Sequence, residues 1–109
     1  MAYHTVNLPS IVLTTSGSPS TGNALTDLTD IYAISIIGPA TLTGTVSIQV
    51  EPTSSGTTYA TLQSGGVDVT VAAARAIVIA PFPYKQITLV STATEDSPRT
   101  FRLAKTFLT

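Results

Sequence analysis

Residues 45–51 read Thr-Val-Ser-Ile-Gln-Val-Glu, a strict alternation of polar and aliphatic side chains. Successive side chains of a β-strand point to opposite faces, so Val46, Ile48 and Val50 are expected to share one face. Alternation over this length predicts a half-buried strand. We expect the same two-residue period to govern most of the chain.

On the C-terminal side of this strand, turn-forming residues recur at short intervals. Residues 52–56 are rich in Pro, Ser and Gly, Gly65-Gly66 follows, and Pro81-Phe82-Pro83 interrupts the chain again. Such residues favour turns because of their backbone preferences and local hydrogen bonds. Between the turns and beyond the polar loop 92–98, strands are predicted over residues 57–63, 67–71, 76–80, 85–91 and 100–108.

On the N-terminal side, residues 31–37 form an almost continuous apolar run that ends at Gly38-Pro39, which predicts a buried strand. Residues 14–23 are rich in Ser, Thr, Gly and Pro and are interpreted as a loop or flexible linker. The short extended stretches before them form either an arm laid on a neighbouring subunit or the first strand of the chain's own domain. The predicted division is an N-terminal arm and linker, residues 1–24, and a β-sandwich domain, residues 25–109.

About eight short strands separated by turns predict an all-β fold, a single-domain antiparallel β-sandwich of jelly-roll-like type with an extended N-terminal arm. A chain of 109 residues accommodates one such domain. The only helical candidates, residues 25–30 and 71–77, are too short or too rich in β-branched residues to compete.

Composition argues against several classes of protein. The net charge of −1 and five scattered Lys and Arg residues give no basis for binding nucleic acid. The chain lacks cysteine, so a disulfide scaffold and a thiolate metal site are excluded. Neither a signal peptide nor an apolar run of about 20 residues is present, so no membrane association is expected and synthesis in a cytoplasm is the default.

The sequence offers no credible set of catalytic or metal-binding groups. Its single histidine, His4, lies in the N-terminal stretch, away from any predicted partner. Asp27 and Asp30 are interpreted as turn and cap residues, and Glu95 and Asp96 as solvated side chains of a polar loop. We therefore expect no enzyme activity, no metal and no cofactor.

Tyr59, Phe82 and Tyr84 are candidates for an aromatic platform that stacks on sugars, which requires them to be exposed on one face. The alternative is that the Phe-Pro-Tyr segment is a buried turn anchor.

Sheet edges with few charged residues tend to pair with other chains. Charged residues make up only 10% of this chain, so we expect its edges to be covered by copies of itself, as a dimer or trimer, or by a partner. The candidate partner-binding residues lie in the N-terminal stretch and are Tyr3, Val6, Leu8, Ile11 and Leu13.

Two segments resemble those of a known family. Residues 50–52 (Val-Glu-Pro) and 56–62 (Gly-Thr-Thr-Tyr-Ala-Thr-Leu) resemble a hairpin of small phage virion proteins. Residues 81–91 (Pro-Phe-Pro-Tyr-Lys-Gln-Ile-Thr-Leu-Val-Ser) and 99–103 (Arg-Thr-Phe-Arg-Leu) are similar to the closing strand pair of that family, the decoration (cement or stapling) proteins of tailed-phage capsids.

The resemblance implies a β-sandwich or jelly roll on the outer surface of the virion, bound to the major capsid protein and made in the host cytoplasm. Its expected function is to bridge neighbouring coat subunits and stabilise the phage head. It implies no catalytic residue and no cofactor. Two alternatives are a receptor- or carbohydrate-binding module of a tail fibre, head fibre or baseplate, and an accessory domain of an enzyme.

Overall fold

A computed structural model describes residues 2–17 and 19–108, which contain strands and no helix. Ten strands replace the eight expected, because the predicted strands 57–63 and 67–71 are each split into two-residue pieces. The strands are β1 (Tyr3–Leu13), β2 (Ala33–Ile37), β3 (Val46–Glu51), β4 (Ala60–Thr61), β5 (Gln63–Ser64), β6 (Val67–Asp68), β7 (Thr70–Val71), β8 (Ala76–Ile79), β9 (Gln86–Ser91) and β10 (Arg99–Leu108).

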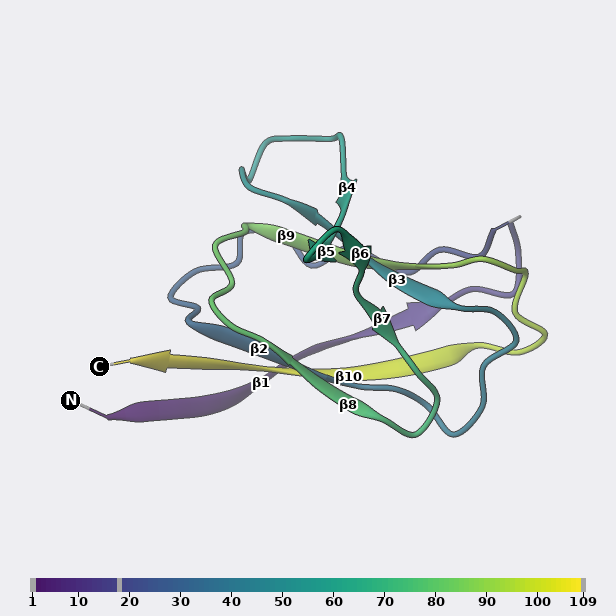
Figure 1. Cartoon of the computed structure of the whole chain (residues 1–109), viewed down its shortest axis with the longest axis horizontal. Coiled ribbons are helices and arrows are strands. Elements are labelled where there is room, and N and C mark those ends of the chain that lie inside the picture. The colour runs from purple at the N-terminus through teal and green to yellow at the C-terminus, as the bar shows by residue number, and fades with distance from the viewer. Residues whose placement is uncertain (1, 18, 109) are drawn as a thin grey trace.

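Two antiparallel sheets pack face to face, and a small β5–β6 hairpin lies outside them (Figure 1). The first sheet has the order β1–β10–β2–β8. In the second, β3 pairs with β9 on one side and with β4 and β7 on the other. The prediction of an all-β, sandwich-like fold is confirmed.

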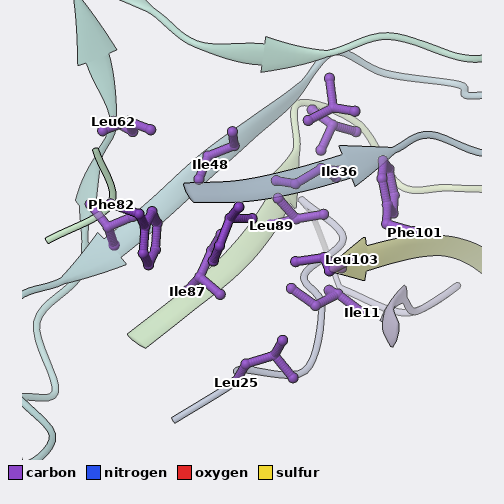
Figure 2. Packing of buried hydrophobic residues seen from close by; sticks show 14 of the residues in the cluster. Ile11, Leu25, Ile36, Ile48, Leu62, Phe82, Ile87, Leu89, Phe101 and Leu103 are labelled. Carbon is purple, nitrogen blue, oxygen red and sulfur yellow. The ribbon is translucent and has the colours of Figure 1, made fainter. Parts of the chain in front are cut away.

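The core lies between the two sheets. The alternation in β3 is confirmed, since Val46, Ile48 and Val50 are all buried. Figure 2 shows Ile36 and Phe101 of the first sheet and Ile48, Ile87 and Leu89 of the second among the clustered core side chains. Burying such side chains stabilises each by roughly 1.5–3 kcal/mol relative to exposure, so this layer is the main source of stability.

Residues 20–28 run along the outer edge of β9. The Gly22 amide donates to the Leu89 carbonyl at 2.9 Å, and the Leu25 amide donates to the Ile87 carbonyl at 2.9 Å. The Leu25 side chain is buried between the sheets. Both sides of the predicted boundary between residues 24 and 25 therefore contribute to a single core.

Candidate interaction surface

β1 and β10 form a two-stranded ribbon that extends beyond the sandwich. These strands have 11 and 10 residues, whereas β2 has five and β8 has four. Their pairing runs continuously from Tyr3 opposite Leu108 to Leu8 opposite Leu103. The start of β1 and the end of β10 lie together at the projecting end (Figure 1), and the molecule measures 44 Å along its longest axis against 28 and 27 Å along the others.

Both faces of the projecting ribbon are uncovered at β1. Residues 3–7 are all exposed. Because consecutive side chains of a strand point to opposite faces, five exposed residues in succession mean that neither face of β1 is packed against another layer. A projecting ribbon with apolar side chains on it is a candidate contact surface.

The five predicted contact residues fall into two groups. The Tyr3 and Val6 side chains are 60% and 42% exposed, and Leu8 is half-buried. Ile11 and Leu13 have no exposed surface and belong to the core of this chain. Of the five, Tyr3 and Val6 are thus the side chains that a partner could reach most fully.

Aromatic side chains gather at the end of the ribbon, on both of its faces. The Tyr3 and Tyr32 rings are tilted with centroids 5.4 Å apart, and the His4 and Phe107 rings are stacked at 5.5 Å. The Lys105 ammonium lies 5.4 Å from the Phe107 ring centroid. Aromatic pairs hold large contact areas in fixed geometry. We call these aromatic residues, together with the exposed aliphatic residues beside them, the ribbon tip: Tyr3, His4, Val6, Tyr32, Phe107 and Leu108.

Sequence reasoning missed four residues of the ribbon tip: His4, which was considered only for catalysis, and three residues from outside β1. Tyr32, Phe107 and Leu108 join Tyr3 only because β1 pairs with β10 and the Tyr32 amide donates to the Thr106 carbonyl at 2.8 Å. The sequence did contain one signal. The last predicted strand, residues 100–108, still carries the apolar residues Phe107 and Leu108 at its end, after Phe101 and Leu103 have already supplied apolar side chains for the core.

Behind the opposite end of the ribbon, a buried carboxylate joins the loop between β2 and β3 to the end of β9 and the start of β10. Glu95 accepts hydrogen bonds from the Thr43 and Gly44 amides at 2.9 Å each, from the Ser91 hydroxyl at 2.8 Å and from Arg99 Nε at 3.0 Å. The side chain has no exposed surface. The prediction that Glu95 is solvated is wrong; the carboxylate stays buried because donors surround it.

Two neighbours complete this network. The Glu95 amide donates to the Ser20 hydroxyl oxygen at 2.9 Å, which attaches the loop 92–98 to the segment before β2. A Cβ atom on Gly44 would lie 2.4 Å from the Ser91 hydroxyl oxygen, so the close approach requires glycine there. The network fixes the loops that carry the start of β10.

This carboxylate predicts acid sensitivity. Burial raises the pKa of Glu95, but hydrogen bonds from Thr43, Gly44, Ser91 and Arg99 outweigh it and lower the pKa from 4.5 to about 2. A depressed pKa in the folded state stabilises the fold above the unfolded value and loses that contribution as the pH falls. We expect the melting temperature to fall between pH 4.5 and about 2, measured by circular dichroism. Glu95→Gln should lack this fall in melting temperature. A melting temperature that falls by the same amount in Glu95→Gln as in the natural chain would contradict the role given to Glu95.

A second buried network shapes the loop between β3 and β4. Gln86 donates through Nε2 to the Thr53 and Gly56 carbonyls at 2.9 and 2.8 Å, and its Oε1 accepts from the Tyr59 hydroxyl. Glu51 Oε1 accepts from both the amide and the hydroxyl of Thr53, at 3.0 and 2.9 Å. The tyrosine is therefore engaged in holding the loop.

The candidate aromatic platform for sugars does not form. Phe82 is 2% exposed and belongs to the core cluster, and the Tyr84 ring packs edge-on against it with centroids 5.3 Å apart. The exposed cluster of Tyr59, Phe82 and Tyr84 that the carbohydrate-binding alternative requires is therefore absent, and the other interpretation, in which Phe82 is a buried turn anchor, is confirmed by its burial.

No protein-family model, curated protein or solved structure matches this chain. Within residues 2–17 and 19–108, no three His, Cys, Asp or Glu side chains are grouped so as to hold a metal ion. The same residues include no helix with the length and apolar character needed to cross a membrane.

Proposed function

We propose that this chain is a structural virion protein that decorates a phage capsid, docks through its ribbon tip and bridges neighbouring coat subunits of the major capsid protein. The observation that carries the proposal is the β1–β10 ribbon, which projects from the sandwich with both faces of its β1 strand uncovered. The resemblance of residues 50–62 and 81–103 to decoration proteins supports the same function.

The chemistry of the ribbon tip suits docking onto a protein surface. Tyr3, Tyr32 and Leu108 are 60%, 47% and 46% exposed. Aromatic residues are enriched at the centres of protein interfaces, where they supply large contact areas at low entropic cost. Strand pairing holds the tip, so little order must be gained on binding. Repetition over a symmetric lattice multiplies a modest energy per copy.

The location is tested by cryo-electron microscopy of virions of the phage that encodes this chain. We expect density for the sandwich outside the capsid floor, with the ribbon tip directed at the coat. Density confined to the tail would favour the fibre or baseplate alternative, and absence of the chain from the particles would overturn both.

The docking surface is tested with particles stripped of the chain. We expect the double variant Tyr3→Ser, Phe107→Ser to weaken particle binding at least about tenfold, because each ring removed from an interface centre costs more than about 1 kcal/mol. Val67→Ser is the matched control, since Val67 is 69% exposed on the β5–β6 hairpin, away from the ribbon. Equal binding by both variants would place the contact elsewhere. Circular dichroism checks that each variant is folded.

A further inference from the structure

The outer edge of β1 is covered along one half only. In the covered half, Asn23 substitutes for a strand partner: its Oδ1 accepts from the Val12 amide at 2.8 Å, and its Nδ2 donates to the Ser10 carbonyl at 3.2 Å. β1 is the terminal strand of its sheet, and within the described residues no strand or bridge lies along the outer edge of residues 3–8. The outward amides and carbonyls of that half are free to pair.

The open half also lacks the usual protection of an edge. Edge strands are commonly guarded by lysine, by inward-pointing charges, by proline or by bulges. Residues 3–8, Tyr-His-Thr-Val-Asn-Leu, contain no Lys, Arg, Asp, Glu or Pro. Guards appear only at the end of the segment, where Pro9 and a register shift between Leu8 and Ile11 break the regular strand. The uncovered, uncharged stretch is therefore short and has a defined end.

We propose that this edge pairs antiparallel with the same edge of a second copy of the chain, which joins two four-stranded sheets into one sheet of eight strands. An uncharged segment meets no like-charge repulsion from its own copy. An antiparallel pair of identical strands also closes with two-fold symmetry, so association stops at a dimer.

Symmetry fixes the register. A two-fold axis perpendicular to the sheet leaves each face of a strand on the same side of the joined sheet. Residues directly opposite each other must point to the same face, and side chains alternate along a strand, so the numbers of two paired residues differ by an even number. Centring the axis on Thr5 pairs Tyr3 with Asn7 of the partner subunit and His4 with Val6 of the partner subunit. Centring it on Val6 would pair Tyr3 with Pro9 of the partner subunit, which has no amide to donate. The register centred on Thr5 uses the whole uncovered stretch.

The dimer would explain how the proposed bridging works. Bridging two coat subunits needs two attachment points, and the dimer carries two symmetry-related ribbon tips. This role of the dimer on the particle rests on the proposed function. Self-pairing is measured on the isolated chain, so it can fail independently of particle binding. A dimer that does not bind particles would overturn the proposed function alone, and particle binding by a monomer would overturn the pairing alone.

Disulfide trapping tests the register, because the natural chain has no cysteine. Thr5→Cys places two thiols across the axis, where Cα atoms of directly paired strands lie roughly 4.5–5.5 Å apart, within the range of a disulfide. With oxidised glutathione as the oxidant, we expect rapid conversion to a covalent dimer. Val67→Cys, at an exposed site on the β5–β6 hairpin, is the control and should cross-link far more slowly. Equal rates would overturn the proposal.

Sedimentation equilibrium tests the non-covalent dimer. The natural chain should dimerise, and Val6→Lys should weaken the dimer severalfold, because in this register it places two positive charges diagonally across the axis. Val67→Lys adds the same charge away from β1 and should leave the dissociation constant unchanged. A dissociation constant of about 1 mM already corresponds to a weak association. The proposal would therefore be overturned if the natural chain stayed monomeric up to about that concentration. A dimer equally stable in Val6→Lys would overturn it as well.

Discussion

Replacing Glu95 with alanine is expected to lower the free energy of unfolding by about 3–5 kcal/mol, the cost of removing one partner from a buried ion pair. The variant would leave the Thr43 and Gly44 amides, the Ser91 hydroxyl and the Arg99 guanidinium without the acceptor that they share. Buried donors without acceptors pay their full desolvation cost. Urea titration followed by circular dichroism measures the effect.

The neighbouring acid provides a matched control. Asp96 also pairs with Arg99, at 2.6 Å, but its side chain is 79% exposed. An exposed pair contributes about 0–1 kcal/mol, so Asp96→Ala should change stability little. Glu95→Gln should fall between the two, since the amide keeps one acceptor oxygen but directs an N–H₂ group at other donors. Similar losses for Glu95→Ala and Asp96→Ala would show that the buried network is not a major source of stability.

Replacing Ile11 with alanine is expected to cost about 2–5 kcal/mol, the range for truncating a buried aliphatic side chain and leaving a cavity. Ile11 has no exposed surface, and it packs in the same core cluster as Leu89 and Phe101. Chemical denaturation at one fixed, low protein concentration measures the effect on the isolated chain.

This substitution also separates the two interpretations of the N-terminal stretch. In a strand of the chain's own domain, Ile11→Ala destabilises the isolated chain while the exposed Val6→Ala changes stability by no more than about 0.5 kcal/mol. In an arm laid only on a neighbour, both variants would leave the isolated chain as stable as before. The second result would contradict the position of β1 in the sheet.

Local periodicity predicted the strands where one face is buried. The alternation of Val46, Ile48 and Val50 is a property of neighbouring residues, and it survives in the fold because strand geometry alone sets which side chains share a face. The turns at Gly65-Gly66 and at the Pro-Phe-Pro segment were predictable because Gly and Pro favour turns through their own backbone preferences. Alternation failed in β9, where Gln86 and Thr88 are buried along with Ile87 and Leu89. Those polar side chains are covered by loops, which hydrogen-bond to both of them.

The candidate site depends on pairings that a local pattern does not contain. Tyr3 and Leu108 are neighbours across the ribbon although they stand at opposite ends of the chain. Glu95 sits in a segment that reads as a polar loop, and its burial depends on donors on another loop about 50 residues away in sequence.

The sequence by itself determined the all-β class, the positions of most turns and the aliphatic face of each regular strand, because these follow from the two-residue period and from backbone preferences. Only the tertiary structure decided that Ile11 and Leu13 are core residues, that Glu95 is buried and that aromatic side chains meet at the ribbon tip. The physical reason is that strand register and loop packing are set by contacts between distant segments, whose geometry no stretch of neighbouring residues specifies.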